Sequence, residues 1–135
     1  MIDQYDVIYV DDEPTMTAIF NQMVNLKYRH WRILAVNDSE SLFKRIEERS
    51  ISAAVWIVDL MMPGKNGVQI AQAVRGAGDF SAALIGYTAL DAQTLGGSAE
   101  YGAALDVFSR IIGKQEGFLR VLAGLNATAM RQVKA

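Results

Sequence analysis

Apolar residues in this chain gather in five short blocks that are separated by longer segments of mixed character. The blocks span residues 7–10, 31–36, 53–58, 83–87 and 105–108. Short apolar runs rich in β-branched and aromatic residues predict β-strands, and runs without polar alternation indicate strands covered on both faces. We therefore expect five strands, four of them buried on both sides.

The segments between the blocks have the spacing of amphipathic helices. Pro14 suits the first turn of a helix after an acidic residue, and Ser39 precedes the second helical segment. Apolar residues share one face in each of the first three segments: Met16, Ile19, Phe20, Met23 and Val24, then Leu42, Phe43 and Ile46, then Val68, Ala71 and Val74.

Two later segments complete the helical pattern. The fourth connection contains the adjacent residues Gly96 and Gly97. Each glycine costs a helix about 1 kcal/mol relative to alanine, so this helix is predicted to be short or frayed. A last helix is predicted from Gln115 to about Arg131, with one apolar face formed by Phe118, Leu122, Leu125 and Ala129.

Regular alternation of strand and helix requires crossover connections, which produce a parallel sheet with helices on both faces. The predicted fold class is therefore a doubly wound α/β domain with a five-stranded parallel sheet. Ligands of such sheets bind beyond the carboxyl ends of the strands, where the strand order reverses. The residues that follow each strand are the candidates for chemistry.

Acidic residues follow two of the predicted strands. Asp11, Asp12 and Glu13 come after the first strand, and Asp59 ends the third. Three carboxylates at one sheet edge repel each other unless a cation neutralises them or one is protonated. Oxygen ligands without cysteine or a nearby histidine favour a hard ion such as Mg²⁺. Taken alone, an aspartate pair after a strand is equally compatible with a turn or a helix cap.

The residues after Asp59 strengthen the interpretation of a site. Pro63, Gly64 and Gly67 supply tight-turn chemistry that keeps the backbone close to the Asp59 carboxylate. Phosphoryl transfer depends mainly on positioning and charge neutralisation, so a carboxylate beside a divalent cation can serve as its nucleophile. Thr88, at the end of the fourth strand, offers a hydroxyl for the oxygens of a phosphoryl group.

Three stretches together resemble the receiver domain of response regulators, which is CheY-like and flavodoxin-like in fold. They are Val10-Asp11-Asp12-Glu13-Pro14, residues 58–64 with Gly67, and Tyr87-Thr88-Ala89, and the match covers nearly the whole chain. The resemblance implies that Asp59 accepts a phosphoryl group from a histidine kinase or phosphotransfer protein. It further implies Mg²⁺ ligands from Asp12, Asp59, the Met61 carbonyl and, through water, Asp11, with Thr88 and Ala89 at the phosphoryl group.

The chain departs from the family pattern after the fifth predicted strand. The family has a lysine there, usually followed by proline, and the predicted strand puts Arg110 in that position. The alternative is that Arg110 faces solvent and that Lys114, or no residue, takes the role. The family's aromatic switch position, three residues earlier, falls on Val107. Val107 and the neighbouring Phe108 are the predicted output face.

Composition restricts the partners. The chain has 135 residues, 51% of them hydrophobic, which suits one domain spanning 1–135. A net charge of −2 with scattered basic residues predicts no nucleic-acid binding. Without cysteine, a membrane-length apolar run or a secretory signal, we expect a cytoplasmic protein. A downstream output protein, an output domain beyond residue 135 and a homodimer all stay open.

Three functional classes compete. The leading one is a phosphoacceptor switch in a two-component phosphorelay, which is not an enzyme. The second is a degenerate receiver that serves as a phosphorylation-independent interaction or dimerisation module, and Arg110 and Val107 keep it open. The third, a flavodoxin-like enzyme or cofactor carrier, is disfavoured because the acidic residues would repel a phosphate-bearing cofactor. His30 precedes the second strand, away from these acids, and no catalytic role is expected for it.

Overall fold

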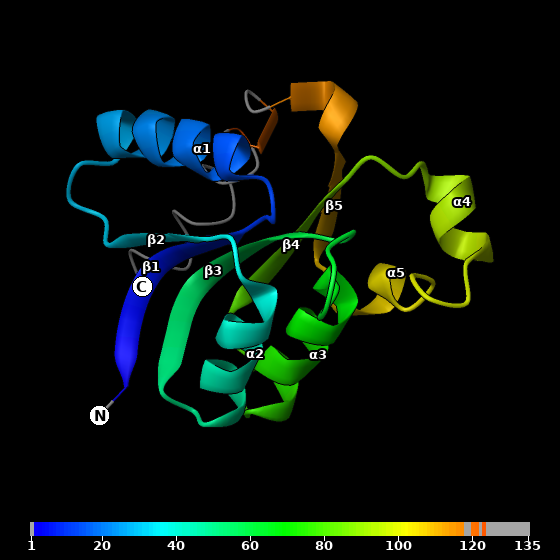
Figure 1. Ribbon diagram of the computed structural model, residues 1–135, viewed down its shortest axis with the longest axis horizontal. Helices are drawn as coiled ribbons and strands as arrows, with labels where there is room; N and C mark the ends of the chain where they lie inside the picture. Colours follow the sequence, from blue (N-terminus) through cyan, green and yellow to red (C-terminus); the bar gives the residue numbers. More distant parts are fainter. Residues whose placement is uncertain (1, 118–119, 122, 124–135) are drawn as a thin grey trace.

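A five-stranded parallel sheet forms the centre of the computed structural model, which describes residues 2–117, 120, 121 and 123 (Figure 1). The strand order is β2-β1-β3-β4-β5, and every pair of neighbours is parallel. The predicted doubly wound sheet is therefore confirmed, with its reversal of order between β1 and β3. The strands are β1 (Asp3–Val10), β2 (Ile33–Val36), β3 (Ile51–Asp59), β4 (Ala83–Thr88) and β5 (Arg110–Gly113).

Helices cover both faces of the sheet. In Figure 1, α2 and α3 lie side by side on one face and α1 lies on the other, while α4 and α5 sit beyond the β5 edge. The helices are α1 (Pro14–Lys27), α2 (Ser39–Glu47), α3 (Gly67–Gly76), α4 (Ala92–Gly97) and α5 (Ala104–Val107), and a 3-10 turn spans Lys114–Glu116.

Two apolar layers hold the helices to the sheet. Because side chains alternate along a strand, β3 sends Trp56 and Val58 towards α2 and α3, and Val55 and Ile57 towards α1. Burial is complete along β4 and at the carboxyl ends of β1 and β3. The edge strands β2 and β5 are mostly half-buried. Three strands, rather than the expected four, are thus covered on both sides.

The starts of the helices follow local capping chemistry. Pro14 lies in the first turn of α1, as predicted. Asp38 caps α2 by accepting hydrogen bonds from the N–H groups of Glu40 and Ser41, so Ser39 is the first helical residue rather than the cap. Asn66 caps α3 in a reciprocal pair with Gln69. The short fourth helix is confirmed, since α4 has six residues and ends on the two glycines.

The predicted fifth strand is wrong. Residues 104–107 form the single turn α5, and the strand begins at Arg110. A short apolar run cannot be assigned to strand or helix by periodicity alone, and the pairing with β4 decides here. Ile112 lies opposite Tyr87 and is buried, whereas Leu105 is exposed. Most of the last helix predicted, from residue 115 to about 131, lies outside the described residues.

Candidate functional site

Three carboxylates meet at the reversal point of the sheet. β1 and β3 are neighbours, so Asp11, which follows β1, and Asp59, which ends β3, lie at the same edge. Oxygens of Asp11, Asp12 and Asp59 lie within 4.8 Å of one another. Asp11 is 0% exposed and Asp59 2%, whereas Asp12 is half-buried.

Backbone groups hold the two buried carboxylates in place. The N–H of Glu13 donates to Asp11 Oδ1 at 3.0 Å, and the N–H of Met61 donates to Asp59 Oδ1 at 3.2 Å. The start of α3 packs directly on this turn, because a Cβ on Gly67 would lie 2.4 Å from the Asp59 carbonyl oxygen. Glycine at 67 is therefore a steric requirement of the site.

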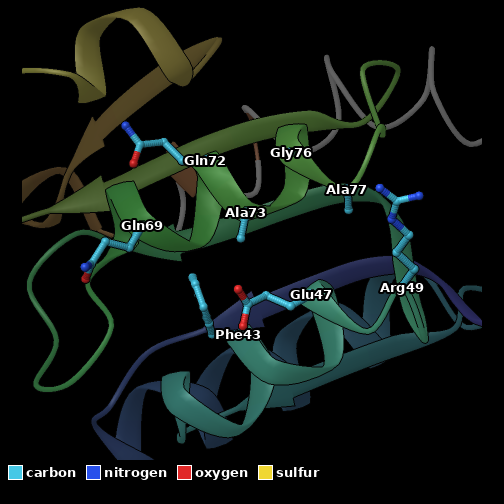
Figure 2. A pocket seen from close by; sticks show the side chains of 8 residues that line it. All are labelled: Phe43, Glu47, Arg49, Gln69, Gln72, Ala73, Gly76 and Ala77. Atoms are coloured by element: carbon cyan, nitrogen blue, oxygen red, sulfur yellow. The ribbon is translucent and has the colours of Figure 1, made fainter.

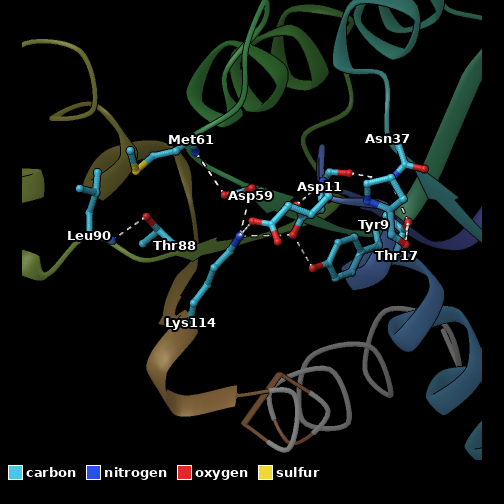
Figure 3. A network of polar contacts seen from close by, with 11 residues as sticks. Tyr9, Asp11, Thr17, Asn37, Asp59, Met61, Thr88, Leu90 and Lys114 are labelled. Carbon is cyan, nitrogen blue, oxygen red and sulfur yellow. Dashed lines mark hydrogen bonds and ion pairs between the residues drawn. The ribbon is translucent and has the colours of Figure 1, made fainter.

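Lys114 supplies the cation of the site. It follows β5, and its Nζ lies 3.2 Å from Asp59 Oδ2 and 3.4 Å from Asp11 Oδ2 (Figure 3). The more distant Glu13 carboxylate is 4.0 Å away. The same ammonium group sits 5.6 Å from the centre of the Tyr87 ring.

Arg110 is not at this edge, and the prediction that it follows the fifth strand is wrong. It is the first residue of β5, lies opposite Ile85 and is exposed. The alternative weighed from the sequence, with Arg110 in solvent and Lys114 at the acidic residues, is the arrangement observed. The strand begins at Arg110, five residues after the predicted start at Leu105. The residue that follows the strand is therefore Lys114 rather than Arg110.

The charges of the site are unbalanced. Burial and then the charge of Asp11 raise the pKa of Asp59 to about 7, although Lys114 and the Met61 N–H act in the other direction. Burial disfavours the charged form of Lys114, but the charges of Asp59 and Asp11 outweigh it and raise its pKa. Two buried carboxylates and a half-buried third thus face one ammonium group, an arrangement that favours an additional cation.

The remaining predicted residues divide between the site and the core. Thr88 ends β4 one residue after Tyr87, which pairs with Asp59, and its Oγ1 accepts a hydrogen bond from the Leu90 N–H at 3.0 Å. Ala89 follows and is exposed.

The prediction that Val107 and Phe108 form an output face on the fifth strand is wrong, because both residues precede β5. Val107 is half-buried and ends α5, and Phe108 is 6% exposed, with its ring packed over Gly86. With the cation at Lys114, the position three residues earlier is Ile111, which is half-buried.

The model of the response regulator receiver domain family matches residues 7–121, a stretch that includes all three carboxylates and Lys114. This chain belongs to the response regulator receiver domain family. The receiver domain is a signalling domain of the two-component type. A curated relative, stress response regulator protein 1 of Lodderomyces elongisporus, is 35% identical over 74 residues, or 55% of this chain. That match covers 20% of the relative, so the chain spans about a fifth of its length.

Solved structures share the fold of this receiver domain. A CheY-like receiver domain protein from Methanospirillum hungatei aligns with a TM-score of 0.74 at 13% identity, covering 99% of this chain and 98% of the other. A DNA-binding response regulator of the LuxR family from Staphylococcus aureus has a TM-score of 0.71 at 20% identity, covering 93% and 98%. Within the described part of the receiver domain, no helix is long and apolar enough to span a bilayer.

Two residues of the receiver site, Tyr9 and Asn37, were not predicted from the sequence. The Tyr9 hydroxyl donates to Asp11 Oδ2 at 2.8 Å, and Asn37 Nδ2 donates to the Asp11 carbonyl at 2.9 Å and to Thr17 Oγ1 at 2.8 Å. The Tyr9 contact had a signal, since residues two apart on a strand share a face of the sheet. No sequence pattern indicates the Asn37 contacts, because they join residues at the ends of β1 and β2 and in α1 that lie far apart in the chain.

A groove of about 520 Å³ lies elsewhere on the receiver domain, between α2 and α3 (Figure 2). None of the three clustered carboxylates lines it, so it is separate from the acidic site. Its lining residues are Phe43, Glu47, Arg49, Gln69, Gln72, Ala73, Gly76 and Ala77.

Proposed function

We propose that this receiver domain accepts a phosphoryl group on Asp59 from a histidine kinase or a phosphotransfer protein and then alters a downstream output protein or domain. One observation carries the proposal: Lys114 Nζ bridges the carboxylates of Asp59 and Asp11, with Asp12 beside them, at the carboxyl edge of the sheet. A nucleophilic carboxylate, a cation and spare carboxylate charge are the groups that phosphoryl transfer needs.

The donor set fits magnesium. Every side-chain ligand in the cluster is an oxygen, and Asp12 is half-buried rather than fully buried. We assign Asp12, Asp59 and the Met61 carbonyl as ligands, with Asp11 acting through water. Asp11 accepts from three donors, the Glu13 N–H, the Tyr9 hydroxyl and Lys114 Nζ. Magnesium bound there would neutralise charge on the carboxylates and on the incoming phosphoryl group.

The transfer itself is a displacement at phosphorus. An oxygen of the Asp59 carboxylate attacks the phosphorus of a phosphohistidine, a new O–P bond forms, and the N–P bond breaks. The electron pair of that bond stays on the imidazole, which takes up a proton as it leaves. Lys114 then has the phosphoryl oxygens as partners. Thr88 Oγ1 accepts from Leu90, which leaves its own proton available for donation, and the N–H of Ala89 lies next to it.

A phosphorylation-independent interaction module is the second candidate, and Ile111 favours it. The family's aromatic switch residue would stand at this position, three before Lys114, and an isoleucine has no aromatic ring to couple to Thr88. The two candidates differ in one respect. The switch requires a structural response to a phosphoryl group, whereas the module keeps one conformation throughout.

Intact-mass measurement with acetyl phosphate and magnesium tests the proposal. The carboxylate should displace acetate from phosphorus and add the mass of one phosphoryl group, and hydroxylamine should remove it as it cleaves an acyl phosphate. Asp59→Asn should add nothing, because an amide is not a competent nucleophile. Asp106→Asn, at an exposed aspartate of α5, is the matched control and should be labelled like the parent. Equal labelling of Asp59→Asn would reject Asp59 as the acceptor.

A further inference from the structure

Tyr9 is a buried tyrosine whose hydroxyl is used inside the acidic site. Its side chain is 0% exposed and lies on the α1 face of the sheet. The ring packs against Phe20 of α1, with ring centres 4.3 Å apart, and its neighbour Tyr87 stands edge-on at 6.5 Å. The ring is thus held from two sides. The hydroxyl donates to Asp11 Oδ2 at 2.8 Å.

Asp11 depends on a small set of donors. It is fully buried, so bulk solvent does not replace a hydrogen bond that it loses. Oδ1 accepts from the Glu13 N–H, and Oδ2 accepts from both the Tyr9 hydroxyl and Lys114 Nζ (Figure 3). Two donors, one neutral and fixed, the other charged and on a long side chain, therefore serve the same oxygen.

Lys114 divides its ammonium group between two carboxylates. Its Nζ is 3.2 Å from Asp59 Oδ2 and 3.4 Å from Asp11 Oδ2. A phosphoryl group on Asp59 brings up to two negative charges and three acceptor oxygens to this place. Lys114 would be drawn to these oxygens and away from Asp11. Without a second donor on Oδ2, that movement would leave the buried Asp11 oxygen unpaired.

We propose that Tyr9 is a positioning residue that holds Asp11 Oδ2 and thereby releases Lys114 to bind the phosphoryl group on Asp59. This inference rests on the proposed function and deepens it. Tyr9 touches neither the phosphoryl donor nor the reacting atoms. It acts through the competition between Asp11 and Asp59 for one ammonium group. Among the residues that the structure describes, removal of its hydroxyl leaves Lys114 as the side-chain donor to Asp11 Oδ2.

The test uses beryllofluoride with magnesium as a stable mimic of the phosphoryl group, with affinity measured by calorimetry. Tyr9→Phe keeps the ring that packs on Phe20 and removes only the hydroxyl. A hydrogen bond to a charged group is strong enough that roughly tenfold weaker binding is expected. Tyr5→Phe is the matched control, because it removes a hydroxyl from the same strand at a residue outside the acidic cluster. It should bind like the parent.

A double-mutant cycle with Lys114→Met separates positioning from a merely structural role. Magnesium is kept saturating throughout, and the methionine background has no ammonium group that moves between Asp11 and the mimic, so the side-chain donors to Asp11 are the same before and after the mimic binds. Tyr9→Phe should then change the affinity by less than about twofold. Equal weakening in both backgrounds would show a structural role and overturn the proposal. No weakening in the Lys114 background would overturn it as well.

A second measurement distinguishes failure of the Tyr9 proposal from failure of the phosphoacceptor function. In the metal-free protein without any mimic, Tyr9→Phe should shift the ammonium NMR signal of Lys114 and slow its hydrogen exchange, because Asp11 holds it more tightly. An unchanged Lys114 signal overturns the Tyr9 proposal, whatever the parent binds. A parent that binds no beryllofluoride overturns the phosphoacceptor function and, with it, the movement of Lys114.

Discussion

Replacing Asp59 by asparagine is expected to stabilise the metal-free protein at pH 8, although it removes the acceptor of the proposed reaction. Asp59 is buried beside Asp11, and these two causes raise its pKa from 3.8 to about 7. A raised carboxyl pKa means that the folded state binds the proton more tightly than the unfolded state does. The corresponding stability is fully present below about pH 4 and is lost as the pH rises through about 7.

The size of the effect follows from the shift. A difference of about 3 pKa units, at about 1.4 kcal/mol each, sets an upper limit of about 4 kcal/mol on the cost of ionising Asp59 in the folded protein. Asparagine avoids this cost but gives up the ion pair with Lys114 and the strong hydrogen bond from the Met61 N–H. We expect a net gain of about 1–2 kcal/mol at pH 8.

Urea unfolding in the presence of EDTA, at pH 5 and at pH 8, measures the effect. Asp59→Asn should be more stable than the parent at pH 8 and lose most of that advantage at pH 5, where the parent carboxyl is largely protonated. Asp106→Asn, at an exposed aspartate, should match the parent at both values. An Asp59→Asn protein that is less stable than the parent at pH 8, or equally advantaged at both pH values, would refute the reasoning.

Three further predictions concern the cation, the packing and the metal. Lys114→Ala should lower the free energy of unfolding by about 1–3 kcal/mol in urea, because two buried carboxylates lose their ammonium partner, whereas Arg110→Ala should stay within about 0.5 kcal/mol of the parent. Gly67→Ala should lower the free energy of unfolding, measured by thermal unfolding, by about 1–3 kcal/mol or more, because its Cβ clashes with the Asp59 carbonyl. Gly97→Ala, whose Cβ would meet nothing within 4 Å, should raise it by up to about 1 kcal/mol. Magnesium should bind the parent in calorimetry and fail to bind Asp12→Ala at the same concentrations; equal binding by both would remove Asp12 from the ligand set.

The sheet and the acidic cluster could be predicted because both depend on local patterns. Continuous apolar runs mark the central strands, and parallel strands bring their carboxyl ends to one edge. Asp11 and Asp59 had to meet once β1 and β3 were neighbours. The turn after Asp59 could also be predicted, because the backbone there has no room for a side chain at position 67 and glycine is required.

The fifth strand and its cation could not be predicted in the same way. The segments 105–108 and 110–113 are both short and each combines a charged residue with apolar ones, so pairing with β4 is what distinguishes them. That pairing joins Ile112 to Tyr87 and the Ser109 N–H to the Leu84 carbonyl, contacts between residues far apart in the sequence. The position of the cation depends on where the strand before it ends. Because the strand was predicted too early in the chain, Arg110 was predicted at the site instead of Lys114.

The hydroxyl of Tyr9 shows a second limit. Its position two residues before Asp11 places both side chains on the same face, and this much is visible in the sequence. Whether the hydroxyl reaches the carboxylate depends on the ring packing against Phe20 across the α1 interface. Contacts of this kind require the tertiary structure.

Site mapping by peptide mass spectrometry tests the central claim most directly. The protein is treated with acetyl phosphate and magnesium, and borohydride then reduces any acyl phosphate to the alcohol, which converts the labelled aspartate to homoserine. The account predicts homoserine at position 59 and unmodified aspartate at positions 11 and 12. Homoserine at Asp11 or Asp12, or a phosphorylated protein in which Asp59 is unchanged, would contradict it.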